Sequence, residues 1–278
     1  MTETDSPWQN INVDDKKQPL YIIKTGGNVI DDESSLHSFL KDFSSIEEKK
    51  ILIHGGGKIA TAIGEKLGIE SNYIDGRRIT NDATIDLVTM VYAGLVNKKI
   101  VAALQSLGCN AIGLTGADAN VLPAKKRPVK SIDYGWVGDI DPTDINMGIW
   151  RLFLDNRLVP VVAPLTHDEQ GHILNTNADT IAAVLSASLS KLYIVKLIYC
   201  FEKNGVLQDV NDEQSFLAQL NAKAYHDLKE NKNLFAGVLP KIDNAFDAVK
   251  NGVQEVVIGN SGSLLHLVKG ECGTKIIL

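Results

Sequence analysis

The sequence has few cysteines, few aromatic residues and no excess of positive charge. Its 278 residues include three cysteines, Cys109, Cys200 and Cys272, which are far apart and odd in number. This pattern argues against a disulfide framework or a cysteine metal cluster, and it favours reduced thiols in the core of a cytoplasmic protein. The net charge of -6 argues against nucleic-acid or anionic-membrane partners, because either would need a basic face. A small-molecule partner is favoured.

Long apolar runs are also missing. We find no run of membrane-spanning length, and the polar, acidic start from Met1 to Pro19 predicts no signal peptide. Residues 1–18 are predicted to be a loose polar tail. A hydrophobic fraction of 44% in 278 residues is enough for a large aliphatic core, in one domain or in two lobes.

Two catalytic motifs are absent from the sequence. An acyl hydrolase of the lipase type would need a Gly-x-Ser-x-Gly elbow, and the nearest stretch, Gly259–Gly262, has the wrong spacing. The Gly-x-x-x-x-Gly-Lys-Ser/Thr phosphate loop is missing too, which excludes the kinases that depend on that loop.

Short apolar runs alternate along the chain with segments of helical periodicity. This alternation predicts an α/β fold with a largely parallel sheet covered by helices. Two segments interrupt the alternation, Ser71–Thr80 and Ala117–Asp139, and we expect hairpins or flaps there. The predicted strands are Leu20–Lys24, Ile51–His54, Ala111–Leu114, Val159–Ala163, Leu192–Lys196, Glu255–Ile258 and Lys275–Leu278, and the predicted helices are Glu33–Asp42, Lys58–Leu67, Asn81–Ser106, Asp144–Asn156, Asp179–Ser188 and Lys241–Asn251.

Glycine loops follow the first two predicted strands. Lys24 ends the first strand and Gly26–Gly27 come after it, whereas His54 ends the second and Gly55–Gly57 lead directly into a helix. Ligands bind at the carboxyl edge of such sheets. Glycines there let backbone N–H groups approach an anion, and a lysine supplies a point charge for phosphate. The loops therefore predict an anion site, while His54 is expected to be a packed, hydrogen-bonded residue.

Three further stretches carry polar groups suited to a site. Asp75–Thr80 places guanidinium groups in a flap, where they suit capture of a carboxylate, and Asn175–Thr180 opens a helix that its side chains can cap. Lys241 lies at the start of a late helix. A carboxylate nucleophile, with a reference pKa of about 4.3, is ionised at neutral pH and needs no base. Two lysines, two glycine loops and an aspartate suit phosphoryl transfer to such a group.

In their order along the chain, these stretches resemble the amino-acid kinase family, and most closely its acetylglutamate kinases. The resemblance covers nearly everything after Pro19. It implies a three-layer sandwich with a central mainly parallel sheet and two lobes, 19–188 for the acyl amino acid and dimerisation and 189–278 for ATP. The matching stretches are Lys24–Gly27, His54–Gly57, Gly76–Thr80, Gly113–Asp118, Asn175–Thr180 and Lys241.

The resemblance also implies a function. The chain would use ATP, with Mg²⁺ carried by the nucleotide, to phosphorylate the γ-carboxylate of N-acetyl-L-glutamate or a close N-acyl-glutamate in arginine biosynthesis. It would act as a cytoplasmic homodimer. The resemblance implies that Lys24 and Lys241 bind the transferring phosphoryl group and that Asp179 holds both lysines in place. Gly26 would lie near the nucleotide, and Arg78 and Asn175 would bind the acylated amino acid. The glycines implied at the reacting groups are Gly27, Gly56 and Gly57.

This chain departs from the family pattern at two places. Tyr199–Val206 replaces the family's usual Asp-Val-x-Gly-Val turn near the nucleotide, and the resemblance implies that Glu202 stands in for the aspartate. Arg77 stands where the family often has an apolar residue. One interpretation is that its guanidinium faces solvent. The other is that Arg77, or the lysines of Lys125-Lys126-Arg127, meets an extra carboxylate on a larger acyl group such as succinyl.

Other functions stay open from the residues alone. One is N-succinyl-L-glutamate kinase, and another is a different carboxylate or carbamate kinase of the same superfamily, whose glycine loops would look alike. A third is a catalytically silent amino-acid sensor, against which Lys24, Asp179 and Lys241 argue together. Arginine-inhibited hexamers in the family have an additional N-terminal helix. Because residues 1–19 have little apolar periodicity, we expect a dimer without strong arginine inhibition.

Overall fold

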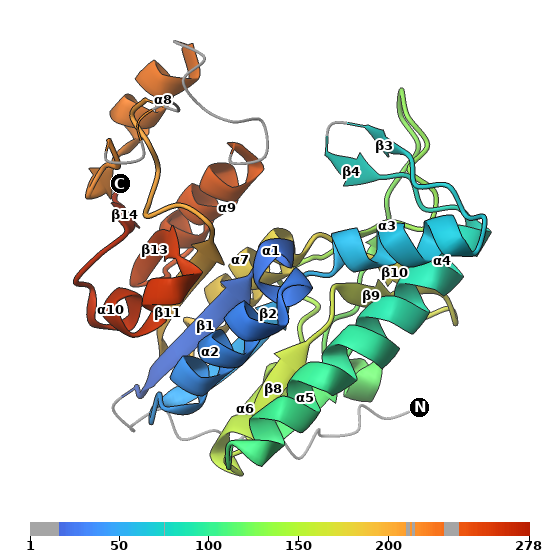
Figure 1. Cartoon of the computed structure of the whole chain (residues 1–278), viewed down its shortest axis with the longest axis horizontal. Coiled ribbons are helices and arrows are strands. Elements are labelled where there is room, and N and C mark those ends of the chain that lie inside the picture. The colour runs from blue at the N-terminus through green and yellow to red at the C-terminus, as the bar shows by residue number, and fades with distance from the viewer. Residues whose placement is uncertain (1–16, 75, 210–211, 213–214, 231–238) are drawn as a thin grey trace, which may run out of the picture.

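The computed structural model describes residues 17–278, apart from residue 75 and residues 210–211, 213–214 and 231–238. The predicted polar tail therefore lies almost wholly outside the described residues. The main sheet has eight strands, all paired in parallel except β13 with β14 (Figure 1). In sheet order they are β12 (Gln219–Leu220), β14 (Thr274–Ile276), β13 (Glu255–Asn260), β11 (Ile194–Phe201), β1 (Pro19–Thr25), β2 (Lys49–His54), β8 (Val159–Val162) and β5 (Ala111–Leu114).

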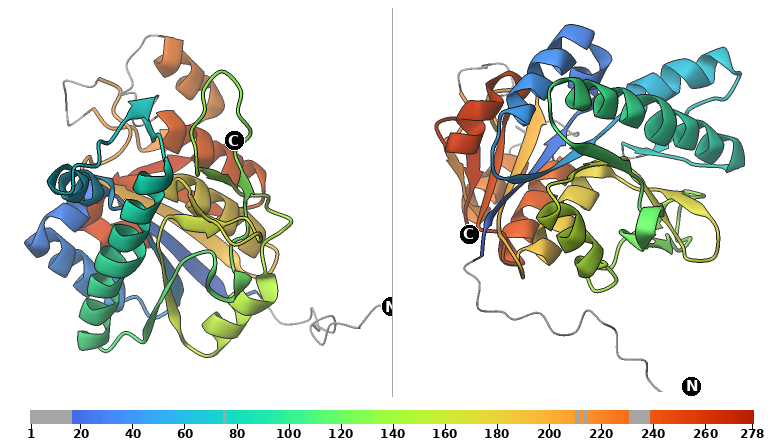
Figure 2. Two further views of the ribbon diagram at one scale, coloured as in Figure 1. Left: turned by 90° about the vertical axis from the view of Figure 1, so that its right-hand side faces the viewer. Right: turned by 90° about the horizontal axis from the view of Figure 1, so that it is seen from below.

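Helices cover both faces of this sheet, so the predicted three-layer α/β fold is confirmed (Figure 2). One face carries α6 (Met147–Asp155), α7 (Ala178–Leu189), α8 (Ala222–Glu230) and α9 (Leu239–Lys250). The other face carries α1 (Gly27–Asp31), α2 (Glu33–Ser44), α3 (Gly57–Lys66), α4 (Asp82–Val88), the π-helical η1 (Thr89–Val96), α5 (Asn97–Ser106) and α10 (Leu264–Lys269).

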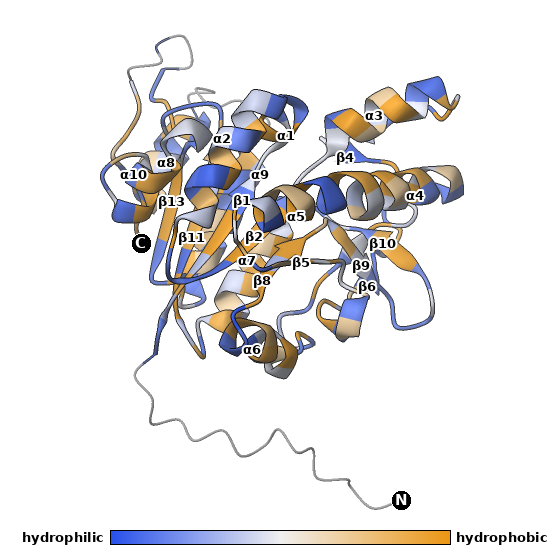
Figure 3. Cartoon of the chain, turned by 60° about the horizontal axis from the view of Figure 1, so that its bottom comes forward, coloured by the Kyte–Doolittle hydropathy of each residue, from blue (hydrophilic) through white to orange (hydrophobic). Residues whose placement is uncertain are grey.

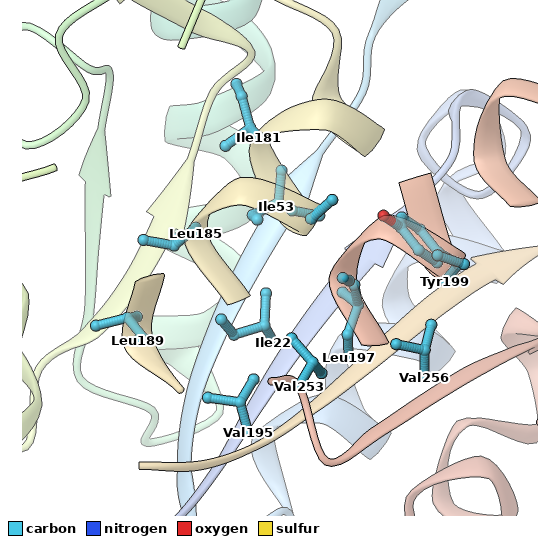
Figure 4. Packing of buried hydrophobic residues seen from close by; sticks show 14 of the residues in the cluster. Ile22, Ile53, Ile181, Leu185, Leu189, Val195, Leu197, Tyr199, Val253 and Val256 are labelled. Carbon is cyan, nitrogen blue, oxygen red and sulfur yellow. The ribbon is translucent and has the colours of Figure 1, made fainter. Parts of the chain in front are cut away.

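Strand β1 lies in the middle of the sheet, between β11 and β2. Its apolar run is buried on both faces, as expected inside a parallel sheet. Because side chains alternate along a strand, Ile22 packs into one core layer, whereas Tyr21 and Ile23 pack into the layer on the other face. Figure 4 shows the first layer, where Ile22 lies among side chains of α7 and β11. Both layers extend across the division proposed at residue 188, and the two lobes stay a prediction.

Short antiparallel pairs lie beside the main sheet. The two predicted flaps each contain one, and the flaps contact each other, because Trp136 N donates to Thr80 O at 2.7 Å. A third pair was not predicted. The pairs are β3 (Tyr73–Ile74) with β4 (Arg77–Arg78), β6 (Lys125–Lys126) with β7 (Gly138–Asp139), and β9 (Leu165–His167) with β10 (Ile173–Asn175), and short 3-10 turns occur at Asp118–Asn120 and Ser261–Ser263.

Some predicted boundaries and elements are wrong. The strand predicted at Leu192–Lys196 begins only at Ile194, because Leu192 and Tyr193 still hydrogen-bond back to the end of α7. The short helices α1, α8 and α10 were missed. Five or six residues show too little periodicity to identify α1 or α10, and α8 is mostly polar.

The expectation that no apolar run reaches membrane-spanning length also needs correction. By length and composition alone, the continuous helix of 25 residues from Asp82 to Ser106 is long and apolar enough to cross a bilayer. In the fold, however, Leu87, Val91, Ile100 and Leu104 bury one side of it in the core. Figure 3 shows apolar and polar residues together on α4 and α5, which is the pattern of a helix lying on a sheet.

Candidate active site

Three charged side chains meet beyond the carboxyl end of β1. Lys24 comes from β1, Asp179 from the first turn of α7 and Lys241 from the first turn of α9. The Lys24 Nζ lies 2.8 Å from Oδ1 of Asp179, and the Lys241 Nζ donates to Oδ2 at the same distance. One carboxylate thus fixes two ammonium groups that come from opposite ends of the sequence.

Charge dominates the electrostatics of this cluster. Burial alone would raise the pKa of Asp179, but the charges of Lys24 and Lys241 outweigh it and hold the pKa below its ordinary value. Burial, with the like charge of Lys24, lowers the pKa of Lys241. The carboxylate therefore stays ionised at neutral pH, and two cations against one anion leave the cluster ready for a further negative group.

Tyr199 contacts both Asp179 and Lys241. Its hydroxyl donates to the backbone carbonyl of Asp179 at 3.0 Å, and the Lys241 Nζ lies 5.5 Å from the centre of its ring. Asn177 caps α7, since its side chain accepts from the N–H groups of Asp179 and Thr180. These contacts fix the first turn of α7, and with it the carboxylate. The role of Tyr199 was not recognised in the sequence, whereas the predicted capping of this helix by the Asn175–Thr180 stretch is confirmed.

The two glycine loops lie side by side next to the lysines. The Gly55 N–H donates to the carbonyl of Thr25 at 3.2 Å, which joins the loop after β2 to the end of β1. Gly56 has a φ of 150°, and a Cβ there would lie 3.0 Å from the ring of Tyr92. Only glycine fits that position. The loops lead into α1 and α3, whose N-cap residues are Gly26 and Gly56. Neither helix start has a side-chain cap from its N-cap residue.

Arg78, in strand β4 of the first flap, and Asn175, at the end of β10, also line the site. Arg78 is buried, and its Nη2 donates to Gly57 O at 2.8 Å and to Thr61 Oγ1 at 2.9 Å. Its guanidinium also lies over the ring of Tyr73. The Asn175 amide donates to Thr80 Oγ1 at 3.1 Å. Both side chains are therefore held in place by the protein before any ligand arrives.

Most of the predicted site residues line one cavity of about 250 Å³. Lys241 and Gly26 are not among the residues that line it. Lys241 pairs with the wall residue Asp179, and Gly26 is the N-cap of α1. Their proposed roles stay predictions. The predicted residues on the cavity wall are Lys24, Gly27, Gly56, Gly57, Arg78, Asn175 and Asp179.

The wall also contains residues that the sequence did not single out, above all Tyr73, Tyr92 and Val137. Arg127 is a wall residue too, whereas the lysines before it turn away. Lys125 pairs with Asp144 at 3.8 Å and Lys126 lies over the ring of Trp136. Of the tripeptide that was considered for an extra carboxylate, Arg127 alone therefore lines the cavity. Arg77 is exposed and lies at the rim.

Glu202, in the stretch that departs from the family pattern, is linked by hydrogen bonds to the first glycine loop. The amide of Asn28, next to Gly27, donates to Glu202, and Lys58 donates to the same Asn28 side chain. Glu202 is thus tied to the first glycine loop. Within the described ranges, no group of three or more His, Cys, Asp or Glu residues is arranged to hold a metal ion.

The sequence is similar to acetylglutamate kinases over nearly its whole length. The chain is 51% identical over 263 residues to the acetylglutamate kinase of Cytophaga hutchinsonii, covering 94% of this chain and 99% of that protein. It is 48% identical over 260 residues to that of Bacteroides fragilis, covering 94% and 97%.

Among solved structures, the fold matches an N-acetylglutamate synthase from Neisseria gonorrhoeae complexed with coenzyme A and N-acetyl-glutamate. The TM-score is 0.79 at 23% identity, over 93% of this chain and 59% of that one, which is a likeness of fold alone. The amino acid kinase family model matches residues 19–260, a span that holds the lysine pair, its aspartate and both glycine loops. This chain belongs to the amino acid kinase family.

Proposed function

We propose that this protein is an ATP-dependent kinase that phosphorylates the γ-carboxylate of an N-acyl-L-glutamate, as in arginine biosynthesis. The observation that carries the proposal is the pairing of Lys24 and Lys241 on Asp179 beside two glycine loops. Similarity to two acetylglutamate kinases, at 51% and 48% identity, supports the same activity.

The reaction needs one bond to form and one to break. An oxygen of the γ-carboxylate attacks the γ-phosphorus of ATP, and the bond from that phosphorus to the β,γ-bridging oxygen breaks. The products are an acyl phosphate and ADP. The nucleophile is already an anion at neutral pH, so no residue has to remove a proton. The obstacle is repulsion between two anions, which the site has to offset.

Lys24 and Lys241 supply the positive charge for this step. We assign to them the equatorial oxygens of the phosphoryl group, where negative charge is spread in the transition state. Asp179 keeps both ammonium groups in position at 2.8 Å without cancelling their charge. The N–H groups of Gly27 and Gly56 would donate to the same oxygens, with Gly26 and Gly57 shaping the loops around them.

Arg78 and Asn175 are proposed to bind the amino-acid end of the substrate. Both are fixed by protein contacts and line the same cavity as Lys24. The α-carboxylate of the substrate would bind Arg78, and its γ-carboxylate would lie at Lys24. Glutamate would then be held across the site with its side chain in position for reaction.

The site suits a nucleotide better than a metal held by protein ligands. Asp179, a wall carboxylate, already has a lysine on each oxygen. Lysines and backbone N–H groups fit phosphates, and Mg²⁺ would come with ATP. When bound, it would neutralise charge on the phosphates.

The test is ADP release with magnesium and ATP, offering N-acetyl-L-glutamate, N-succinyl-L-glutamate and free L-glutamate in parallel. We expect turnover of an acylated substrate that is lost in Lys24→Ala. If folded protein binds ATP but turns over none of the three, the proposal is wrong, and a different carboxylate kinase or a silent sensor takes its place.

We further propose a cytoplasmic homodimer, with 19–188 as the lobe for the acyl amino acid and 189–278 as the lobe for ATP. Support for the dimer comes from Met90 and Leu95 on η1, whose exposed fractions are 57% and 38%. Such large apolar side chains on one helix suit burial against a second copy.

A further inference from the structure

Arg127 is fixed along one edge of its guanidinium group. Its Nε donates to both carboxylate oxygens of Asp139 at 3.1 Å, and its Nη2 donates to Oδ1 of the same residue. The backbone holds it as well, because the Arg127 N–H donates to Val137 O at 2.8 Å. The side chain therefore has one orientation before any ligand binds, which lowers the entropy lost on binding.

On the other edge of the same group, Nη1 has no hydrogen-bond partner among the described residues. The Nη1 of Arg127 is buried and, among the described residues, makes no hydrogen bond. Buried donors are nearly always paired, so an unpaired donor on a residue that lines a cavity needs an explanation. Arg127 lines the cavity that also holds Arg78 and Asn175. An acceptor on a bound ligand would provide the missing partner.

The chemistry of that acceptor follows from what the rest of the cavity already binds. In the proposed function, the γ-carboxylate of the substrate lies at Lys24 and its α-carboxylate at Arg78. Arg127 then remains, and the exposed Arg77 lines the same cavity. Arginine presents a planar pair of donors that matches a carboxylate, and a neutral acetyl methyl group would leave those donors unpaired.

We propose that the acyl group of the substrate ends in a carboxylate, as a succinyl group does, and that the free edge of Arg127 binds it. This inference rests on the proposed function and specifies its acyl class. Arg77 adds positive charge at the entrance, and Asp139 acts as a positioning residue for Arg127.

The experiment compares kcat/KM for three substrates of the wild-type protein: N-acetyl-L-glutamate, N-succinyl-L-glutamate, and the neutral amide of the succinyl compound. We expect the succinyl compound to exceed both others by roughly 10- to 100-fold, the range of a hydrogen bond to a charged group. The amide has nearly the same size, so the difference would report charge. Equal use of the succinyl compound and its amide would overturn the inference, as would a preference for acetyl.

Variants then assign the effect to a residue. Arg127→Gln should lower kcat/KM for the succinyl substrate by roughly 10- to 100-fold and leave the acetyl substrate within about threefold. Asp139→Asn keeps the arginine but loosens it, and should give a smaller loss with the same selectivity. Arg151→Gln is the matched control, since Arg151 also pairs with an aspartate, Asp155, but lies outside the cavity.

The outcomes separate the two proposals. Equal losses with both acyl substrates in Arg127→Gln would mean that Arg127 binds the α-carboxylate or only supports the fold, and the inference would be wrong. Turnover of the acetyl substrate alone would also overturn it while the proposed function survives. Absence of turnover with every acylated glutamate would instead remove the proposed function itself.

Discussion

The side chain of Asn97 donates a hydrogen bond to Nε2 of His54 across 3.1 Å, between α5 and the end of β2. On the other side of the ring, His54 Nδ1 lies 2.7 Å from the carbonyl of Gly55. A carbonyl can only accept, so Nδ1 carries the proton and the ring is neutral. The histidine thus links the core to the second glycine loop, and it has no free nitrogen for proton transfer.

Unfolding free energy should fall in mild acid because of this histidine. Burial lowers the pKa of His54 from 6.5 to about 4. Between these values the unfolded chain binds the additional proton, so stability is complete above pH 6.5 and declines as the pH falls towards 4, by up to about 3 kcal/mol. Urea unfolding from pH 4 to 8 measures this slope.

The test variant is His54→Asn, which removes the titrating ring but keeps a donor for Gly55 O. The control is His37→Asn, on the exposed face of α2. The slope should shrink in the first variant only. An unchanged slope in His54→Asn would assign the acid sensitivity to other groups.

Replacing the central carboxylate should affect both stability and rate. Asp179→Asn leaves two buried ammonium groups without their counter-charge, and we expect a loss of about 3–5 kcal/mol in unfolding free energy. Since the lysines would no longer be fixed, kcat should fall by roughly 100-fold or more. Urea unfolding and steady-state kinetics check the two effects separately. A kcat within threefold of wild type would show that Asp179 does not position the lysines.

Adjacent glycines in the second loop should respond differently to an added methyl group. Gly56→Ala forces alanine to a φ of 150° and brings its Cβ to 3.0 Å from Tyr92, whereas the Cβ of Gly57→Ala meets nothing closer than 4.0 Å. We expect the first change to cost about 1–3 kcal/mol and the second to be nearly neutral for stability. Thermal unfolding of both variants tests this, and equal melting temperatures would contradict it.

The proposed dimer can be tested through its exposed apolar helix. Met90→Glu places a charge on the exposed face of η1 and should shift the protein towards monomer, because burying an unpaired charge is costly. Light scattering after gel filtration gives the mass. Leu152→Glu, at a residue 42% exposed on the other face of the sheet, is the control and should stay dimeric. A wild-type monomer, or a dimer unaffected by Met90→Glu, would exclude this interface.

The sequence predicts the parallel sheet and the place of the two glycine loops because both depend on local patterns. Short apolar runs followed by glycines identify β1 and β2 in the sequence. The carboxyl ends of parallel strands then lie at the same edge of the sheet. The lysine at the end of β1 could therefore be placed at the site. The pairing of Lys241 with Asp179 came from the family resemblance, since no local pattern joins residues so far apart.

Arg127 shows what sequence patterns cannot give. It lies in an irregular flap among other basic residues, and its environment is set by Asp139 on β7 and by Val137 just before that strand. The two preceding lysines have the same charge but turn elsewhere. Only the tertiary structure separates the three. The π-helical stretch η1 was similarly unpredictable, because its apolar residues suit an α-helix equally well.

Strand order has a consequence for the growing chain. Strand β1 leaves the ribosome first, but its partner β11 is made much later, after residue 193. Until then the backbone edge of Leu20–Thr25 is without one neighbour. Chains truncated before Ile194 would keep this apolar edge unpaired and should aggregate. Chains truncated after β11 should stay soluble.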